Sequence, residues 1–342
     1  MATTTVPVID FSAFQSTDSE ARSALVNQIG AACKKSGFFQ LVNHGIPESL
    51  QRELLSCCQE FFSLPLEVKE TYNKDIGGYN RGYERLRAQN FEKRTEGDLK
   101  EGYYFGLDLP VSHPKVAANT FGLGPNKYPQ HVKNPALFKK TVDTYHASMR
   151  QLAENIVKTL CLTLGVEDSW LPELAETPIA VLRLLHYPPQ PPEASELERG
   201  IGAHTDFGTI TILMQDQVGG LQVFDRDFKA WIDVEPTPGA LVVNLGNLMM
   251  RWTNDRYISN LHRVINRSGR ERYSVPFFFS GNPDFLVKCF PQFENSGEQE
   301  KAKYPPVTVG EWILGRYADT YGTSKEKAVA ELSVKEATMG SA

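Results

Sequence analysis

Three residues in the second half of the chain have the types and the spacing of a metal-binding site. His204 and Asp206 lie two residues apart in the run GIGAHTDFGTITIL, residues 200–213. In a β-strand the side chains of residues i and i+2 point to the same face, so a strand over 203–213 would project this imidazole and carboxylate together. A third ligand must come from another strand. Among the other histidines, His262 in SNLHRVIN is the best candidate, because it lies in a β-rich stretch.

The chemistry of this set is that of a catalytic iron centre. An HxD pair alone is a weak signal, because a histidine near an aspartate is usually a hydrogen-bonded surface pair. Two histidines and one carboxylate, however, form the facial triad of non-haem Fe(II) oxygenases, which leaves coordination positions open for chemistry. A zinc hydrolase could use the same ligands, but the chain shows no general-base glutamate of the HExxH kind.

A second pair of residues predicts a site for a carboxylate next to the metal. Arg272 and Ser274, in RYSVPFFF, share one face of a predicted strand and offer a guanidinium beside a hydroxyl. A buried arginine in an apolar strand needs an anionic partner, because an unpaired buried charge is costly. Tyr187, in LLHYPP, could donate a third hydrogen bond. We therefore expect a small carboxylate-bearing molecule at this site.

Composition favours a globular enzyme over a nucleic-acid or membrane protein. The 342 residues are 41% hydrophobic and 23% charged, with a net charge of −5 and no block of basic residues. We therefore expect a small-molecule substrate, no nucleic-acid partner and no membrane partner. The N-terminal stretch lacks the pattern of a signal peptide, and no apolar run reaches the roughly 20 residues of a membrane span. Five scattered cysteines fit free thiols in a reducing cytosol, so the expected location is cytoplasmic.

The elements that must position these residues divide the chain into a helix-rich N-terminal half and a β-rich C-terminal half. Helical spacing predicts helices over 18–37, 47–65, 134–165 and 308–321, and strands over 6–14 and 38–46. After residue 178, short β-rich runs separated by turn residues predict a sandwich or barrel. The polar, glycine-rich segment 73–98 is interpreted as a long surface excursion, possible cover for a site. The predicted regions are 1–120, helix-rich; 121–177, a long helix packing on the core; 178–290, the β-rich domain; and 291–342, a helix and tail.

Several longer motifs resemble one family over nearly the whole chain. VPVIDFSAF and SGFFQLVNHGIP are similar to its N-terminal region, and LRLLHYPP, AHTDFGTITIL, GGLQVF, VVNLGNLMMRWTND, LHRV and RYSVPFFF are similar to its core. The family is that of 2-oxoglutarate/Fe(II)-dependent dioxygenases of the isopenicillin-N-synthase-like superfamily. The core motifs look most like those of its microbial and fungal members, including the thymine-hydroxylase group.

The resemblance implies a fold, a reaction and a role for each site residue. The implied fold is mainly β with flanking helices, a double-stranded β-helix or distorted jelly roll. His204, Asp206 and His262 would bind Fe(II), and Arg272, Ser274 and Tyr187 would bind 2-oxoglutarate. With O₂, such an enzyme hydroxylates or desaturates a small organic molecule and releases succinate and CO₂, typically in specialised metabolism. Asn247 departs from the family, which commonly has aspartate there, and we expect only a local turn effect.

The alternatives differ in their co-substrate and in their substrate contacts. The same iron site and clamp could serve a co-substrate-free or ascorbate-using oxidase, and a non-catalytic binding module would require a lost ligand. The expected substrate pocket consists of Phe207, Phe278, Arg183, Tyr103 and Asn80. Arg183 would pair either with a polar or anionic substrate group or with a structural carboxylate. Of the remaining histidines, we expect His44 in a structural turn, His186 packed in the core, and the others solvated: His113, His131 and His146.

Overall fold

A large sheet runs through the whole molecule and carries most of the site. The computed structural model describes residues 5–89, 97–190, 199–294 and 301–321. The eight strands of this sheet are antiparallel except for the first pair. In spatial order they are β1 (Val8–Asp10), β2 (Phe38–Val42), β10 (Leu241–Leu245), β7 (Ile210–Gln215), β12 (Arg272–Gly281), β5 (Ile179–Tyr187), β4 (Glu101–Phe105) and β3 (Gly82–Glu84).

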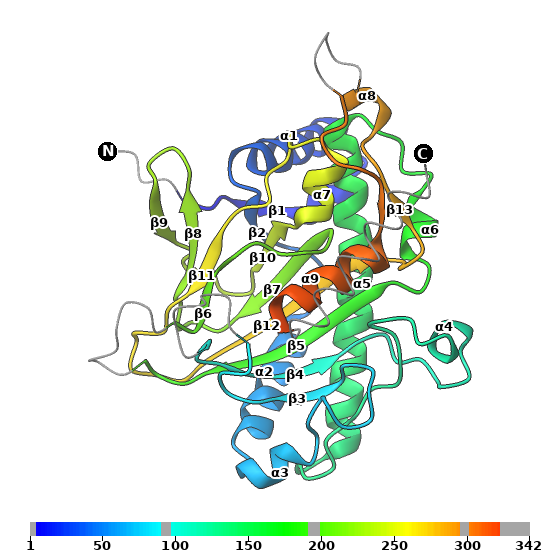
Figure 1. The fold of residues 1–342 in the computed structure, drawn as a ribbon. Coiled ribbons are helices and arrows are strands. Elements are labelled where there is room, and N and C mark those ends of the chain that lie inside the picture. The colour runs from blue at the N-terminus through cyan, green and yellow to red at the C-terminus, as the bar shows by residue number, and fades with distance from the viewer. Residues whose placement is uncertain (1–4, 90–96, 191–198, 295–300, 322–342) are drawn as a thin grey trace.

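A second, smaller sheet packs against one face of the large one (Figure 1). Its strands, all antiparallel, are β6 (Ile201–His204), β11 (His262–Val264), β8 (Leu221–Asp225) and β9 (Ala230–Asp233). An apolar core lies between the sheets, with Leu185 and Val242 from the large sheet and Val223 and Val264 from the small one. A short pair, β13 (Leu286–Val287) with β14 (Val307–Thr308), lies apart. The two packed sheets confirm the predicted double-stranded core.

Helices cover the other face of the large sheet. The longest, α5 (Pro135–Leu164), packs against α1 (Ser19–Lys35), α2 (Glu48–Phe62) and the central strands β7 and β12. Its ends follow from the sequence: Asn134 accepts the Leu137 N–H through Oδ1 at 3.0 Å, and Gly165 ends the helix with a φ of 64°. The shorter helices are η1 (Phe11–Gln15, a 3₁₀ helix), α3 (Leu66–Glu70), α4 (Pro114–Ala117), α6 (Leu171–Ala175), α7 (Asn247–Trp252) and α8 (Pro291–Glu294).

The C-terminal helix α9 (Val309–Tyr321) lies across the strands of the large sheet, in red in Figure 1. It confirms the helix predicted over 308–321. Its Trp312 donates from Nε1 to the backbone oxygen of Phe207 at 2.8 Å, which ties the helix to the loop after β6. The predicted tail beyond Tyr321 lies outside the described residues. No helix among the described residues is long and apolar enough to cross a membrane.

Three expectations about elements are wrong. The run 6–14 is not one strand, because β1 covers only Val8–Asp10 and the 3₁₀ helix η1 (Phe11–Gln15) follows it directly. The run 203–213 is not one strand, because β6 ends at His204 in the small sheet and β7 begins at Ile210 in the large sheet. The segment 73–98 is only partly a surface excursion. Its residues 82–84 form β3, pair with β4 and are buried, while residues 90–96 lie outside the described part of the chain.

Two further histidines, His44 and His146, serve the fold. His44 sits in a turn as expected, with Nδ1 accepting the Ile46 N–H at 3.1 Å. His146, expected in solvent, is instead buried on α5, with its ring edge-on to Phe277 and Nε2 at 3.1 Å from the Ala180 oxygen. The prediction failed because the apolar face of α5 is wide enough to include it. Burial lowers the pKa of His146 to about 4.

Candidate iron and carboxylate site

The three predicted metal ligands come together between the two sheets. His204 at the end of β6 and His262 at the start of β11 are direct partners across an antiparallel pair. Their ring centroids lie 4.2 Å apart. Asp206 follows in the loop that leaves the small sheet for the large one, and its Oδ1 lies 3.7 Å from Nε2 of each histidine. One ligand atom from each residue falls within 4.8 Å of the others, which fits a single metal ion.

Backbone carbonyls fix the orientation of both imidazoles. Nδ1 of His204 lies 2.8 Å from the Gly202 oxygen, and Nδ1 of His262 lies 3.2 Å from the Asn260 oxygen. Because a carbonyl oxygen only accepts, each Nδ1 must carry the proton, and each Nε2 then presents a lone pair toward Asp206. This is the tautomer and the second contact that metal-binding histidines use.

The carboxylate of Asp206 is also fixed in orientation, in this case by two side-chain donors. Its Oδ2 accepts hydrogen bonds from Thr211 Oγ1 at 2.6 Å and from Asn244 Nδ2 at 2.7 Å. The other oxygen, Oδ1, is the one that faces both histidines. Neither Thr211 nor Asn244 was identified from the sequence, because nothing in their local pattern shows which carboxylate they would contact.

Burial and the charges on neighbouring residues determine the protonation states of His204 and Asp206. Burial and, next in size, a charge on His262 together lower the pKa of His204 to about 3. Burial alone would raise the pKa of Asp206, but the two histidines and the hydrogen bonds from Asn244 and Thr211 lower it below its usual value. Neutral imidazole and ionised carboxylate are the forms that bind a metal ion.

The three residues predicted to form a carboxylate clamp also lie together. Arg272 is fully buried on β12, directly opposite Tyr187 of β5, with its guanidinium carbon 4.7 Å from the Tyr187 ring centroid. Ser274, two residues further on the same face, lies 3.4 Å from the Tyr187 hydroxyl, oxygen to oxygen. Burial raises the pKa of Tyr187, so its phenol keeps its proton and can donate.

Among the described residues, no carboxylate pairs with the guanidinium of Arg272. Its two hydrogen-bond acceptors are neutral: the Gly219 oxygen at 2.6 Å from Nε and Gln215 Oε1 at 3.0 Å from Nη2. Its Nη1 and the Nε2 of Gln215 are buried and have no partner among the described residues. A buried cation with an idle donor fits a carboxylate ligand, because leaving such a charge uncompensated is costly. Gln215 was missed from the sequence, where it ends an ordinary strand.

The predicted metal ligands and the predicted clamp residues line one cavity, which also contains most of the predicted substrate pocket. Of that prediction, Phe207, Phe278, Arg183 and Asn80 line the cavity. The strand β5 contributes every second side chain to it: Val181, Arg183, Leu185 and Tyr187. Four residues of strand separate Arg183 from Tyr187, about 13 Å.

The prediction of Tyr103 is wrong. Tyr103 is fully buried on the opposite face of β4, where its ring packs against Phe61 and its hydroxyl donates to the Lys127 oxygen at 3.1 Å. Its neighbour Tyr104 lines the cavity instead. The physical reason is the alternation of a β-strand, in which a shift of one residue moves a side chain to the other face. Gln89, Phe121 and Tyr317 also line the cavity and were not anticipated.

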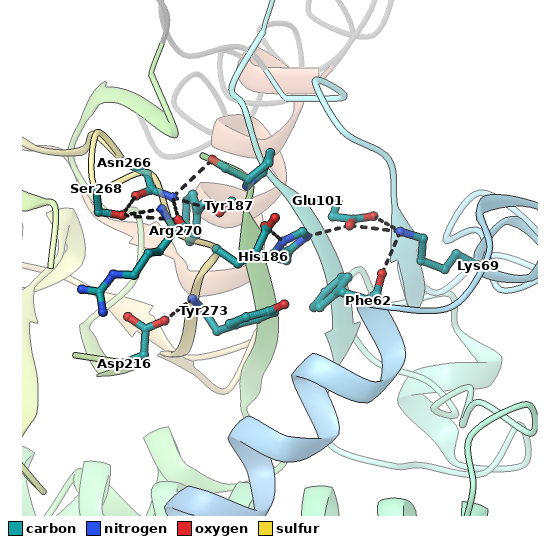
Figure 2. A network of polar contacts seen from close by, with 12 residues as sticks. Phe62, Lys69, Glu101, His186, Tyr187, Asp216, Asn266, Ser268, Arg270 and Tyr273 are labelled. Atoms are coloured by element: carbon teal, nitrogen blue, oxygen red, sulfur yellow. Dashed lines mark hydrogen bonds and ion pairs between the residues drawn. The ribbon is translucent and has the colours of Figure 1, made fainter. Parts of the chain in front are cut away.

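His186 belongs to a separate polar network on the far face of β5. Figure 2 shows its ring beside Glu101, with Nδ1 2.8 Å from Glu101 Oε1. Glu271 accepts on the other side, at 2.5 Å from Nε2, and Lys69 Nζ also donates to Glu101, at 2.8 Å. The ring stacks on Phe62 and Tyr273. This packing agrees with the expected core role and keeps His186 away from the metal ligands.

Asn247 also has the local effect that was expected of it. Its backbone N–H donates to the backbone oxygen of Asp206 at 2.8 Å. Its side-chain Nδ2 donates to Thr205 Oγ1 and to Ser259 Oγ. These contacts brace the loop that carries the carboxylate. An asparagine amide can donate here, so the departure leaves the ligand set intact.

Comparison with family models finds two matches that together span most of the chain. Residues 6–131 match the family described as "non-haem dioxygenase in morphine synthesis N-terminal". Residues 178–281 match the "2OG-Fe(II) oxygenase superfamily". The second match contains His204, Asp206 and His262 together with Arg272 and Ser274.

Relatives and solved structures agree with these matches. The chain is 48% identical to the 2-oxoglutarate-Fe(II) type oxidoreductase hxnY of Emericella nidulans, over 97% of this chain and 95% of that protein. It is 38% identical to the 2-oxoglutarate-dependent dioxygenase citB of Monascus ruber, over 92% and 95%. The crystal structure of a full-length Neurospora crassa protein in complex with alpha-KG and thymine superimposes with a TM-score of 0.79, at 27% identity over 92% and 96%.

Proposed function

Because this chain belongs to the 2OG-Fe(II) oxygenase superfamily, we propose that His204, Asp206 and His262 bind its Fe(II). The enzyme uses Fe(II), 2-oxoglutarate and O₂. The support for these three ligands is their convergence between the sheets, with both Nε2 atoms 3.7 Å from one carboxylate oxygen. Each ligand has an outer contact that holds it in the binding form.

We further propose that Arg272, Ser274 and Tyr187 bind the far carboxylate of 2-oxoglutarate. The observation that carries this assignment is the idle Nη1 of a fully buried Arg272, on the cavity that also contains the metal ligands. A guanidinium binds a carboxylate through two parallel hydrogen bonds, and the Ser274 and Tyr187 hydroxyls can add a third. The relatives hxnY and citB are both named as 2-oxoglutarate enzymes, which favours this assignment over a co-substrate-free oxidase or a zinc hydrolase.

When bound, iron with 2-oxoglutarate supplies the oxidation of an unactivated C–H bond, with succinate and CO₂ as co-products. The residues of the chain bind, orient and exclude water. Arg272, Ser274 and Tyr187 would hold the far carboxylate of the co-substrate, and they line the same cavity as the three proposed metal ligands. Phe207, Phe278 and Ile313 supply apolar walls on the substrate side. An apolar wall keeps water from the reacting centre.

We propose that the substrate is a small organic molecule of specialised metabolism, handled in the cytosol without a nucleic-acid or membrane partner. The cavity beside the metal ligands supports a small substrate, and the fungal relatives support the metabolic setting. The five cysteines are all free and buried, which fits a reducing compartment.

An anaerobic titration tests the two sets of residues. Apo-protein receives Fe(II) and then 2-oxoglutarate, and the visible charge-transfer band of the chelated keto acid is recorded. We expect a band in the wild type, no band in His204→Ala, and in Arg272→Met a band only at much higher 2-oxoglutarate. A wild type that binds iron but gives no band would contradict the proposal. Full 2-oxoglutarate affinity in Arg272→Met would contradict the clamp alone.

A further inference from the structure

A buried charge cluster lies behind one wall of the cavity, and of its charged residues only Arg183 lines the cavity itself. Glu84 on β3 lies at its centre and is almost fully buried. Three cations contact its carboxylate: Arg183 Nη2 at 3.0 Å, Lys74 Nζ at 3.2 Å and Lys100 Nζ at 3.5 Å. The Tyr104 hydroxyl donates to Glu84 Oε1 at 2.9 Å. The group of cations is therefore held in place by one carboxylate.

Lys74 orients Asn80 through a chain of donors. Its ammonium donates to the Tyr317 hydroxyl at 2.7 Å, and Tyr317 in turn donates to Asn80 Oδ1 at 2.8 Å. Lys74 also reaches Asn80 Oδ1 directly at 3.4 Å. Because an ammonium has no acceptor, the amide of Asn80 cannot be turned around without placing its NH₂ against a cation. The oxygen of Asn80 is thus engaged, and its Nδ2 is the group left for the cavity.

Lys100 orients Gln89 in the same manner. Its Nζ donates to Gln89 Oε1 at 2.7 Å, and Arg183 Nη2 approaches the same oxygen at 3.4 Å. The amide oxygen of Gln89 is again occupied by cations, which leaves Nε2 as the group that can face a ligand. Both Asn80 and Gln89 line the cavity.

Arg183 is the third member of this wall, next to Asn80 and Gln89. Among the described side chains that line this side of the cavity, it is the only charged hydrogen-bond donor. The guanidinium carbon lies 4.3 Å from the Tyr104 ring centroid and 6.0 Å from that of Phe278. Stacking between rings holds its plane, and Glu84 holds its Nη2. Asn80, Gln89 and Arg183 therefore all offer N–H groups to a ligand, and none of them offers an oxygen.

From this arrangement we propose that the substrate is an organic acid that presents an anionic, acceptor-only edge, such as a carboxylate, to Asn80, Gln89 and Arg183. Its remaining surface is flat and apolar enough to pack on Phe278 and Phe121, which line the same cavity. Glu84 is a positioning residue, because it acts through the three cations and not on the substrate. This inference rests on the proposed function, which supplies the iron and the co-substrate.

The test compares aromatic acids with their own primary amides. Benzoate and benzamide, phenylacetate and phenylacetamide, and 4-hydroxybenzoate and its amide are titrated calorimetrically, at neutral pH, into anaerobic enzyme loaded with Fe(II) and 2-oxoglutarate. An acid and its primary amide have the same shape. They differ only in the group that would face Asn80, Gln89 and Arg183. An all-donor wall predicts that the acids bind at least about ten-fold more tightly than the amides.

Variants of the wall sharpen the comparison. Asn80→Asp and Gln89→Glu keep the shape but replace a donor with an acceptor, and aspartate tolerates the positive φ of 53° at residue 80. We expect each variant to lose the preference for acids. Tyr317→Phe removes the donor that fixes Asn80 and should weaken the preference about three-fold. The matched control is Tyr304→Phe, which removes a hydroxyl bonded to Asp255 on the surface and should change nothing.

The outcomes separate this inference from the function on which it rests. Amides that bind as tightly as acids, an absence of binding by both classes, or an unchanged preference in Asn80→Asp and Gln89→Glu would overturn it. The charge-transfer band of the 2-oxoglutarate complex is recorded in the same samples. A normal band without a preference for acids refutes the substrate class alone, whereas a missing band refutes the proposed function.

Discussion

Asn244 on β10 donates a hydrogen bond of 2.7 Å to Oδ2 of Asp206 and so ties the metal-site carboxylate to a central strand of the large sheet. Thr211 on β7 adds a second bond of 2.6 Å to the same oxygen. Asp206 itself lies in a loop, so these two strands supply the rigidity that the loop lacks. Thr211 and Asn244 thus hold the carboxylate that we propose as a metal ligand, and both bind its Oδ2 and leave Oδ1 facing the two histidines.

Removing one of these donors should weaken iron binding. In Thr211→Val, Oδ2 of Asp206 loses its shortest hydrogen bond, and the carboxylate gains freedom to rotate away from the histidines. Outer contacts of this kind typically change metal affinity by about 10- to 100-fold, and we expect a loss at the lower end because Asn244 remains. The measurement is anaerobic competition for Fe(II) against a chromophoric chelator.

Thr209→Val provides the matched control for this change. Thr209 is equally buried, but its hydroxyl donates to the Ser280 oxygen at 2.8 Å and not to Asp206. Its iron affinity should equal that of the wild type. Equal affinities in both variants would refute the role of Thr211.

The co-substrate clamp predicts a loss of affinity that depends on the ligand's far carboxylate. Arg272→Met removes a charged donor from a buried site, and hydrogen bonds to charged groups contribute about 1.5–3 kcal/mol, so 2-oxoglutarate should bind roughly 100-fold more weakly. Pyruvate has the same keto acid but no far carboxylate. It should therefore bind equally weakly to the wild type and to Arg272→Met, as measured by the charge-transfer band.

The control for the clamp is an arginine on the neighbouring sheet. Arg263→Met removes a guanidinium that stacks on Trp231 at 4.1 Å and bonds to Gln222, outside the cavity lining. Its affinity for 2-oxoglutarate should be unchanged. A similar loss in both variants would mean that the effect of Arg272 is structural.

The sequence grouped His204, Asp206 and His262 as one set, and the structure does bring these three residues together, but the geometry predicted for them is only partly right. A strand over 203–213 would have placed His204 and Asp206 on one face, yet the strand ends at His204 and Asp206 lies in a crossover between sheets. The residue types and their short spacing identified the site. The crossover depends on which sheet each strand joins, and that is set by pairings distant in sequence, such as His204 with His262.

The substrate wall could be predicted only in part. Arg183 and Asn80 were identified, but Tyr103 was chosen where Tyr104 lines the cavity, because local alternation does not show which face of β4 is the inner one. The Glu84 cluster was not anticipated at all. Its ion pair to Arg183 joins residues 99 positions apart, and no local pattern encodes such a contact.

Burial of His146 predicts a loss of stability in mild acid. The pKa of His146 falls from 6.5 to about 4 on folding. Between these two values the unfolded chain therefore binds a proton at His146 that the folded chain does not bind. The free energy of unfolding should therefore decrease as the pH falls from 6.5 to 4, by about 3 kcal/mol from this group. Urea denaturation across this range measures it.

The variant His146→Gln isolates that contribution. Glutamine retains an N–H for the Ala180 oxygen but does not titrate, so its unfolding free energy should depend less steeply on pH between 6.5 and 4. If His146→Gln had the same slope as the wild type, the assignment of this pH dependence to His146 would be wrong.

The buried position of Glu84 predicts a large decrease in the free energy of unfolding when its charge is removed. Burial would raise the pKa of Glu84, but Lys100, Arg183 and Lys74 lower it to about 2. Glu84→Gln leaves these three buried cations facing a neutral amide, and breaking a buried pair in this way typically costs about 3 kcal/mol. The stabilisation is present above pH 4.5 and is lost as the pH falls from 4.5 toward 2. The difference between wild type and variant should thus shrink below pH 4.5, as urea denaturation at pH 7 and pH 4 would record.

An exposed glutamate provides the comparison for Glu84. Glu48→Gln breaks a solvent-facing pair with Arg52 and should change stability by less than about 1 kcal/mol at either pH, because water screens such pairs. A cost confined to Glu84→Gln would therefore come from the buried setting of its three cations and not from the loss of a carboxylate as such. Equal stability of Glu84→Gln and the wild type at pH 7 would show that the cations do not depend on this carboxylate, and Glu84 would lose its role as the residue that positions them.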